Sequence, residues 1–446
     1  MRVESDFLGD KSLEDSELYG VQTKRAIENF AIRYSRTNID FIKSLVLVKL
    51  AAARANFRVK KLSKEKLDLI EKGAFELLTG KYDDQFVTPA IQGGAGTSIN
   101  MNVNEVLCNV ALQLGGHKVG EYSVLHPLDD VNMSQSTNDS VPTALKITAI
   151  KKINTLVEEL MELQMSLQEK EGEFASVKKL GRTQLKDAVE TTLGASFGAF
   201  AECISRDRWR LYKAEERVRQ VNMGGTAIGT GVGTTPEYQF YVVDELQKLT
   251  GLGISRAENL IDATQNLDPL VEVSGLLKTL AVNLSKISND LRLMDSGPQG
   301  GLCEIQLPPL QPGSSIMPTK INPVGPEFVK QIYFRVFSND VLISMAAAEG
   351  EFELNAFFPI IADSLLESLE ILTTGVKFLA EKVIKGIIAN RERCQEYVEK
   401  STIKATKFID KLGYVKLGKL MKEAIEIGEP IEKYIEKFLE VAEEVE

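Results

Sequence analysis

Apolar residues recur at alternating steps of three and four in two long stretches of the chain. Residues spaced in this way fall on one face of an α-helix, so each stretch predicts a long helix with a buried stripe. The stripes consist of Leu270, Val273, Leu277, Leu280, Leu284, Ile287, Leu291 and Met294, and of Leu365, Leu369, Leu372, Val376, Leu379, Val383 and Ile387. Stripes of this length favour a helix bundle, because isolated helices gain most of their stability from packing. The pattern does not distinguish a partner helix in the same chain from one in a second copy.

Shorter periodic segments predict further helices. SKEKLDLIEKGAFELL (63–78) and NEVLCNVALQL (104–114) are two of them, and a third run of apolar residues follows SQSTNDS (134–140). No proline occurs between Pro142 and Pro236, which favours long helices, and the polar GRTQLKDAVE (181–190) is interpreted as a linker between two of them. The segment after about residue 392 is short and rich in charged residues, which indicates a compact helical appendage. Its final acidic run is predicted to lie on a solvated helix face.

These segments predict a mainly α fold. At 446 residues the chain exceeds what one hydrophobic core usually supports, so more than one domain is expected. We predict an N-terminal, mixed but mostly helical domain (1–136), a central helix-bundle domain (137–392) and a small C-terminal helical domain (393–446).

Charge and cysteine content narrow the class of protein. With 63 acidic and 53 basic residues the net charge is −10, which argues against nucleic acid or an anionic membrane as the main partner. The chain has neither an N-terminal apolar segment nor a run of eighteen apolar residues, so a cytoplasmic protein is expected. The cysteines are far apart and form no CxxC pair, which favours free thiols: Cys108, Cys203, Cys303 and Cys394.

The only two histidines, His117 and His126, are interpreted as structural. A Ser-His-Asp triad or a metal site with several histidines would have to use one of them.

The stretch PGSSIMPTKINPVGPE (312–327) is the strongest candidate for chemistry. Its prolines and glycines predict an irregular loop, and it concentrates five polar side chains: Ser314, Ser315, Lys320, Asn322 and Glu327. Taken alone, such a loop is as well explained by a solvated connector. A serine alkoxide is accessible only when donors stabilise it, since each pKa unit corresponds to about 1.4 kcal/mol. Main-chain N–H groups after Ser314 could form an anion hole, and Lys320 could hold a carboxylate.

Two roles remain open for this serine, a nucleophile in acyl transfer or a general base on carbon. Acyl transfer would need a partner base, and none is evident in the sequence nearby.

Two helix starts carry more short polar residues than a helix cap needs. In IQGGAGTSINMN, Thr97 and Ser98 could cap the following helix and present hydroxyls to an anion, although an isolated motif of this kind is usually only a capped turn. In SQSTNDS, any one of Ser136, Thr137, Asn138 and Asp139 would suffice as the cap, and the surplus suits a bound carboxylate.

Several blocks in a fixed order resemble the aspartase/fumarase superfamily. They run from SELYGVQTKRAIENF (16–30) through GGAGTSINMNVNEVL, SQSTND, GRTQLKDAVETTLG, GGTAIGTGVGT, KISNDLRLMDSGP and GSSIMPTKINPV to EGEFELNAFFPII, nearly the whole chain. Within the superfamily the chain is more similar to the aspartases, because fumarases typically read GSGTQSNMN and GRTH where this sequence has GAGTSINMN and GRTQ.

The resemblance implies a three-domain fold whose long central bundle assembles into a tetrameric helical core, with active sites shared among three subunits of a homotetramer. It implies anti elimination of ammonia from L-aspartate to give fumarate, with Ser314 as the general base and an aci-carboxylate intermediate. It places the substrate against Thr97, Ser98, Ser136, Thr137, Asn138, Thr183, Gln184, Lys320 and Asn322, with Ser315 and Glu327 in support. The partner is a small dicarboxylate and no cofactor is required; activation by a divalent cation is not readable from the sequence.

Two alternatives to this function stay open, a fumarate hydratase that uses the same base and a catalytically silent homologue. Two departures from the family pattern bear on them. Asp130 in HPLDDVN stands where fumarases and many aspartases read NDHVN, which argues against a secondary anion contact there. TKFIDKLGY (406–414) lacks the family's LNP, which bears on loop closure and aspartate specificity.

Overall fold

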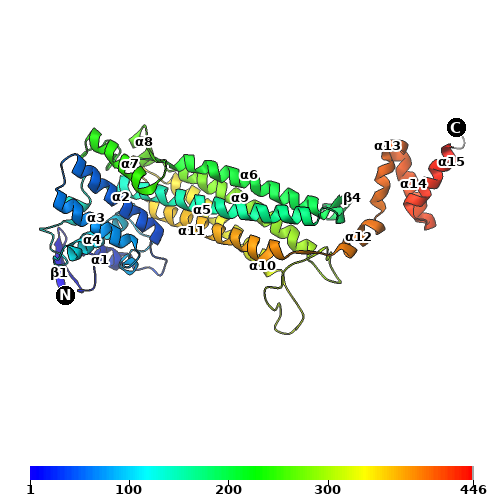
Figure 1. Ribbon diagram of the computed structural model, residues 1–446, viewed down its shortest axis with the longest axis horizontal. Helices are drawn as coiled ribbons and strands as arrows, with labels where there is room; N and C mark the ends of the chain where they lie inside the picture. The colour runs from blue at the N-terminus through cyan, green and yellow to red at the C-terminus, as the bar shows by residue number, and fades with distance from the viewer. Residues whose placement is uncertain (444–446) are drawn as a thin grey trace. The chain divides into compact units, whose positions relative to one another are not determined.

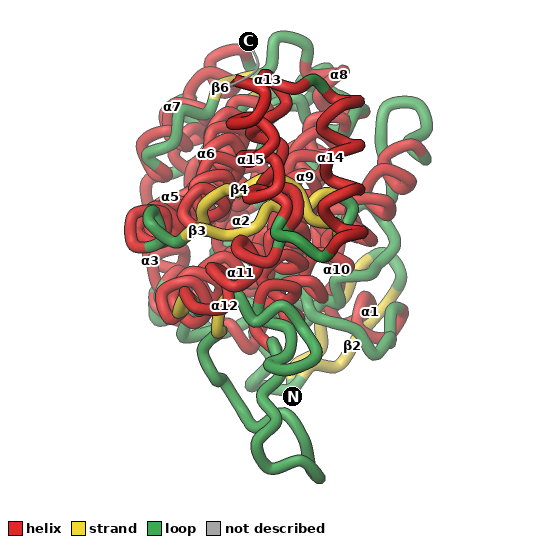
Figure 2. The backbone as a smooth tube through the Cα atoms, turned by 90° about the vertical axis from the view of Figure 1, so that its right-hand side faces the viewer, coloured by secondary structure: helices red, strands yellow, loops and turns green. Residues whose placement is uncertain are grey.

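The computed structural model of the protein describes residues 1–443. Helices dominate, and strands occur only as short pairs (Figure 1; Figure 2). This confirms the mainly α fold expected from the apolar stripes.

The helices follow one another along the chain with short helical turns between some of them. They are α1 (Val21–Asn29), α2 (Ile39–Arg58), α3 (Lys64–Leu78), α4 (Thr97–Leu114), α5 (Thr137–Glu173), α6 (Leu193–Val218), α7 (Pro236–Thr250), α8 (Leu260–Gln265), α9 (Asp268–Met294), α10 (Val324–Ala348), α11 (Phe358–Phe378), α12 (Arg391–Lys400), α13 (Ile409–Leu412), α14 (Tyr414–Ile427) and α15 (Ile431–Glu443). The turns are η1 (Asp83–Gln85), η2 (Pro127–Val131), η3 (Leu379–Val383), η4 (Ile384–Gly386) and η5 (Thr402–Phe408).

The strands pair two by two. The antiparallel pairs are β1 (Arg2–Asp6) with β2 (Gly9–Leu13), β3 (Lys178–Thr183) with β4 (Lys186–Thr192), and β7 (Ile305–Gln306) with β8 (Ile388–Ala389); β5 (Gln220–Val221) and β6 (Ser255–Arg256) are parallel. The prediction of helices at 63–78, at 104–114 and directly after SQSTNDS is confirmed by α3, α4 and α5.

The chain forms two compact units, each assembled from three separate segments. Unit 1 comprises Met1–Glu159, Asp207–Val282 and Gln331–Thr374, and unit 2 comprises Leu160–Arg206, Asn283–Lys330 and the described residues from Gly375 onward. The three-domain boundaries read from the sequence stay a prediction.

Both apolar stripes are buried. Every residue of the stripe in α9 is at most 6 % exposed, and within each unit the stripe residues belong to the core. The second stripe is buried through Ile387, but the regular α-helix ends at Phe378 and continues as η3 and η4. The stripe therefore predicted burial correctly as far as Ile387, but the regular α-helix that it predicted ends earlier, at Phe378.

The polar segment 181–190 is not a plain linker. It forms most of the β3–β4 hairpin, whose register pairs Thr183 with Lys186 and shifts between Leu180 and Arg182. Gln184 and Leu185 make the turn with φ values of 54° and 62°, a conformation that few residues other than glycine adopt. The hairpin lies between α5 and α6, as expected of a connection between two helices.

The C-terminal segment has an apolar core of its own. Buried residues from η5, α14 and α15 pack together there: Ala405, Phe408, Leu417, Leu420, Ala424, Ile431 and Ile435. The segment is helical, as predicted, whereas its status as a separate small domain stays a prediction. The predicted solvated face is seen at Glu436 and Glu440, which are exposed on α15, whereas the last three residues of the acidic run lie outside the described residues.

Glu105 of α4 caps the start of α1. One oxygen of its buried carboxylate accepts hydrogen bonds from the N–H groups of Gly20 (2.8 Å) and Thr23 (3.1 Å), and the other accepts from the N–H of Gln22 (2.9 Å). The first N–H groups of a helix have no partner within the helix, so a buried helix start requires such acceptors. This contact anchors the N-terminal segment to α4.

Replacing Glu105 with glutamine should lower the melting temperature, because an amide N–H₂ would then face main-chain donors. The free energy of unfolding is expected to fall by about 2 kcal/mol, the typical effect of losing hydrogen bonds to a charged group. Glu28→Gln is the matched control, since this exposed residue makes only a surface ion pair with Lys11. Thermal unfolding followed by circular dichroism measures both; equal melting temperatures for the two variants would contradict the capping role.

Candidate active site

The loop before α10 is closed by its own main chain. The N–H of Gly313 donates to the carbonyl of Lys320 (2.7 Å), and the Asn322 side-chain amide donates to the carbonyl of Gly313 (2.8 Å). A Cβ on Gly313 would lie 2.6 Å from the Lys320 carbonyl oxygen, so this close approach needs glycine. The segment between β7 and α10 extends as a long loop (Figure 1). The prediction of an irregular loop is confirmed.

Ser314 sits at the start of this closed turn. Its Oγ accepts hydrogen bonds from the main-chain N–H groups of Ile316 (3.2 Å) and Met317 (3.1 Å). The predicted main-chain donors after the serine are therefore present. Because both donors favour the charged form of the oxygen, they make the alkoxide more accessible than in an isolated serine. No histidine lies in this loop, and both hydrogen-bond donors to the serine oxygen come from the main chain of the turn.

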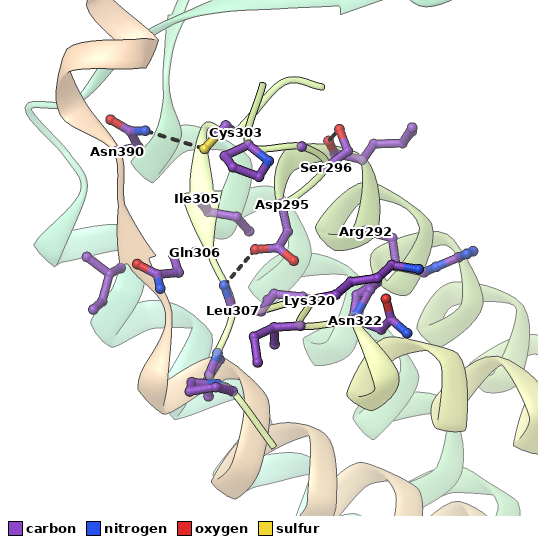
Figure 3. A pocket seen from close by; sticks show the side chains of 18 of the residues that line it. Arg292, Asp295, Ser296, Cys303, Ile305, Gln306, Leu307, Lys320, Asn322 and Asn390 are labelled. Carbon is purple, nitrogen blue, oxygen red and sulfur yellow. Dashed lines mark hydrogen bonds between the residues drawn. The ribbon is translucent and has the colours of Figure 1, made fainter. Parts of the chain in front are cut away.

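A large pocket of unit 2 opens beside the loop, with a volume of about 1350 Å³. Lys320, Asn322 and Glu327 line it together with Arg292, whose guanidinium lies 3.6 Å from the Glu327 carboxylate. Figure 3 shows Lys320 and Asn322 on the side of this pocket opposite Asn390. Two cationic side chains, Arg292 and Lys320, therefore line the pocket together with two carboxyl groups, Asp295 and Glu327.

Asp295 also lines the pocket. Burial raises the pKa of its carboxyl, while the hydrogen bond that its Oδ1 accepts from the N–H of Leu307 (2.9 Å) opposes this shift. The contact ties the end of α9 to the segment after β7 (Figure 3).

The start of α4 presents unused hydroxyls. The cap position is Gly96 with φ 93°, and no side chain caps the helix, so the prediction that Thr97 or Ser98 caps it is wrong. Glycine takes this position because its left-handed conformation is unfavourable for other residues. Thr97 is exposed and Ser98 is half-buried, so both hydroxyls stay available at the positive end of the helix.

The start of α5 is a capping box. Ser136 Oγ accepts from the N–H of Asn138 (3.2 Å), and Asp139 Oδ1 accepts from the N–H of Ser136 (2.9 Å). Ser136 is thus the cap. The Thr137 side chain faces the 97 segment, since a Cβ on Gly96 would lie 3.9 Å from its methyl group. Unit 1 therefore brings the 97 and 136–138 segments together.

Asn138 is held by the GGTAIGTG loop. Its Nδ2 donates to the carbonyl of Ala227 (2.8 Å), and its own carbonyl accepts from Asn222 Nδ2 (2.8 Å). Pro142, four residues on, has no N–H to donate to that carbonyl, which explains why a side chain does so. One N–H of its amide is thus committed, and its Oδ1 remains as an acceptor.

The remaining predicted residues fall in unit 2. Thr183 ends β3 and Gln184 begins the turn of the β3–β4 hairpin, and neither lines the pocket beside Lys320. Ser315 is exposed in the loop, and Glu327 lies in the first turn of α10. The hairpin is anchored by the fully buried Glu304, whose carboxylate pairs with Arg182 (2.7 Å).

Sequence reasoning missed a buried polar cluster beneath the two helix starts of unit 1. Lys49 of α2 is 0 % exposed, and its ammonium donates to Asn100 Oδ1 (2.6 Å), Asn132 Oδ1 (2.8 Å) and Gln135 Oε1 (2.9 Å). A single lysine within the apolar run SLVLVKLAAA is the signal that could have revealed it. Buried charged residues are rare unless they are paired, which makes this one notable.

Asp139 is the acidic member of the same region. It is fully buried, and its Oδ2 accepts from the N–H groups of Gly224 (3.1 Å) and Thr226 (3.0 Å). Burial raises the pKa of Asp139 to about 6, against the hydrogen bonds and the charge of Lys49. Thr226 has φ 58°, a strained value for a β-branched residue, and the contact with Asp139 helps to hold it.

The histidines and Asp130 have structural contacts. His126 Nδ1 accepts from the N–H of Asp129 (3.0 Å) at the start of η2, and His117 lies 3.8 Å from Glu121. Asp130 is 5 % exposed and pairs with Lys66 (2.7 Å). Within residues 1–443, histidine, cysteine, aspartate and glutamate side chains form no group of three or more arranged to hold a metal ion. No helix in this range has both the length and the apolar composition to cross a membrane.

Comparison with known proteins gives full-length relatives. The chain is 48 % identical over 444 residues to an aspartate ammonia-lyase from a Bacillus species, covering 100 % of this chain and 95 % of the relative. It is 47 % identical over 428 residues to the aspartate ammonia-lyase of Helicobacter pylori, covering 95 % of this chain and 91 % of the relative.

Solved structures of related lyases also match this chain over nearly its whole length. The fumarate lyase:delta crystallin of Brucella melitensis, in a cobalt-bound form, matches with a TM-score of 0.94 and 42 % identity over 98 % of this chain and 95 % of that one. The class II fumarase of Schistosoma mansoni matches with a TM-score of 0.95 and 33 % identity over the same shares. The family model described as Lyase matches residues 9–338. The chain therefore belongs to this lyase family, which confirms the resemblance to the aspartase/fumarase superfamily.

Proposed function

We propose that the protein is an aspartate ammonia-lyase that converts L-aspartate to fumarate and ammonia. Full-length relatives of that name at 44–48 % identity support this function more directly than the fumarase match at 33 % identity. The structural observation that carries the mechanism is the pair of main-chain N–H groups on Ser314 Oγ.

In the proposed reaction, the Ser314 alkoxide removes a proton from the carbon next to the β-carboxylate of aspartate. The electron pair of the broken C–H bond moves onto that carboxylate and forms an aci-carboxylate dianion. The pair then returns to form the C=C bond as the C–N bond breaks on the opposite face. Ammonia leaves, and fumarate remains.

Stabilisation of the dianion falls to neutral donors. Thr97, Ser136, Thr137 and Thr183 supply hydroxyls for it, and Ser98 lies beside them at the start of α4. Donors that are already oriented toward the developing charge stabilise the transition state more than the substrate. The capping box at Ser136 and the exposed hydroxyl of Thr97 are consistent with this role.

The other end of the substrate is assigned to charged and amide groups. Lys320 and Asn322 grip the α-carboxylate, while Asn138 and Gln184 face the amino group. The free Oδ1 of Asn138 suits an ammonium group, which only donates hydrogen bonds. Ser315 and Glu327 support the loop. The proposed reaction needs no cofactor.

A homotetramer with shared sites is part of the proposal. On the α10 segment of unit 1, large apolar side chains are exposed at helical spacing: Phe334 (57 %), Phe337 (44 %), Val341 (46 %) and Met345 (66 %). An exposed stripe of this kind favours burial against another copy. The proposed location is the cytoplasm, where the thiols of the buried Cys108 and Cys394 would stay reduced.

The first prediction from this proposed function concerns the substrate. The purified protein should release fumarate from L-aspartate, seen as a rise in ultraviolet absorbance, and should release far less from L-malate. Faster fumarate formation from L-malate would identify a fumarate hydratase, and no reaction with either substrate would identify a silent homologue.

The second prediction concerns the base. Ser314→Ala should lower kcat by about 10³-fold, within the range expected for a general base, with an unchanged melting temperature because the side chain lies in a loop. Ser16→Ala, at an exposed turn outside the proposed site, is the matched control and should retain nearly full activity. Turnover by Ser314→Ala equal to that of the control would exclude the serine as the base.

The third prediction concerns assembly. Val341→Glu should dissociate the tetramer and abolish activity together, because a buried charge at a subunit contact is unfavourable and the sites are shared. Val415→Glu introduces the same charge at an exposed position, 71 % accessible, outside the stripe. Sedimentation velocity and activity are measured for both variants; a fully active Val341→Glu monomer would contradict shared sites.

A further inference from the structure

The two helix starts that carry the proposed dianion site share one buried cation. Asn100, in the first turn of α4, and Gln135, directly before Ser136, both direct their side-chain oxygens to the ammonium of Lys49. Asn132 supplies the third oxygen. The buried ammonium of Lys49 therefore connects the segment of Thr97 to the segment of Ser136 through hydrogen bonds.

The amide oxygens are oriented by the rest of the cluster. Asn100 Nδ2 and Asn104 Nδ2 both donate to Asn132 Oδ1, each at 3.1 Å, and Gln135 Nε2 donates to the carbonyl of Val131 (3.0 Å). The ammonium shares two of its oxygens with other donors, since Asn132 Oδ1 also accepts from the amides of Asn100 and Asn104 and Asn100 Oδ1 accepts from Ser140 Oγ (3.3 Å). Three side-chain oxygens nevertheless converge on the Lys49 ammonium. The cluster is thus built around a positive charge.

No carboxylate neutralises that charge by direct contact. Among residues 1–443, none lies within 4.0 Å of the Lys49 ammonium. Asp139 of α5 is the charged group that acts on it electrostatically, and both oxygens of Asp139 are occupied by main-chain N–H groups. A fully buried ammonium held only by neutral oxygens is costly, and a nearby anion relieves that cost.

The other charged groups around α2 have partners of their own. On α4, Glu105 binds the start of α1, and on η2, Asp130 pairs with Lys66. Three acidic side chains of α3 and α7 pair with arginines of α2: Glu71 with Arg54, and Asp244 and Glu245 with Arg58. Lys49 and Asp139 are therefore two buried charged side chains in direct contact with the helix-start segments, Lys49 through Asn100 and Gln135 and Asp139 through the N–H of Ser136.

We propose that Lys49 is a positioning residue that aligns the 97 and 136 segments and whose charge stabilises the negative charge developing on the substrate carboxylate. This inference rests on the proposed function, which places that carboxylate against Thr97, Ser136 and Thr137. The lysine touches no substrate atom and acts through Asn100 and Gln135. Its effect is electrostatic preorganisation, which strengthens in a site that excludes water.

The state of the free protein gives the proposal a measurable signature. Burial lowers the pKa of Lys49 to about 7, against the attraction of Asp139. A bound dianion favours the charged form and raises this pKa, so the lysine takes up a proton when the ligand binds above about pH 7. Asp139, with its pKa near 6, is already ionised there and contributes little.

The experiment compares Lys49→Gln with Lys66→Gln in the full-length protein. Glutamine keeps a donor for the amide oxygens but removes the charge, so it separates electrostatics from hydrogen bonding. Lys66 is the matched control, since it contacts η2 next to the cluster but is paired with Asp130. Measurements are melting temperature, kcat, KM and the affinity for succinate, a dianion that cannot eliminate ammonia.

Folded Lys49→Gln should lose about 100-fold in kcat/KM on aspartate, mostly through kcat, and bind succinate more weakly, whereas Lys66→Gln should stay within about threefold of the unmodified enzyme. A folded Lys49→Gln within that threefold range would overturn the proposal. Ser136→Ala tests the proposed site separately: if it leaves activity unchanged while the enzyme turns over aspartate, the placement of the carboxylate fails first.

Proton uptake gives an answer even if Lys49→Gln does not fold. Calorimetric titration of the unmodified enzyme with succinate at about pH 8, in two buffers of different ionisation enthalpy, counts the protons taken up. Uptake of a substantial fraction of a proton per subunit supports the proposal, and its disappearance in folded Lys49→Gln assigns it. No uptake by the unmodified enzyme overturns the proposal.

Discussion

A long helix must bury one apolar stripe along its whole length, and this requirement decides where polar chemistry can lie in this chain. The stripe of α9 is buried from Leu270 to Met294 and leaves no room there for substrate-binding groups. Most candidate residues accordingly lie where helices begin, at Thr97, at Ser136 and in the loop before α10, while Thr183 and Gln184 lie in the β3–β4 hairpin. Helix starts also carry N–H groups without partners, so the same places attract anions.

Local hydrogen bonds fix the conformation of the Ser314 turn and of the Ser136 helix start independently of each other. The turn after Ser314 supplies two donors from its own main chain, and the capping box at Ser136 uses only four consecutive residues. The local geometry of each segment is thus set by hydrogen bonds between residues that are close in the chain. Tertiary contacts then fix orientation, as when Ala227 takes the amide N–H₂ of Asn138.

This division explains how much the sequence could predict. Periodicity identified α9, α4 and α5, and the family blocks identified the loop residues, because both signals are local in the chain. The hairpin over 178–192 escaped because its strands are short and polar, without the alternation that marks a half-buried strand. The cap at Gly96 escaped because a left-handed glycine can replace a hydroxyl cap.

The contacts of Lys49 were not predictable from spacing. Its three acceptors lie 51, 83 and 86 residues away along the chain, and only the fold brings them to one ammonium. The sequence shows a lone lysine in an apolar helix, but it does not show whether that lysine reaches solvent. Burial at 0 % exposure settles this point and makes the charge part of the site region.

The apolar core of the C-terminal segment bears on how this segment tolerates substitution. Ala405, Phe408, Leu417, Ala424 and Ile435 satisfy one another, so substitutions among them need compensation only from close neighbours. The segment that lacks the family's LNP lies inside this self-contained core. Substitutions in this portion can therefore be accommodated by its own core without repacking the long bundle helices.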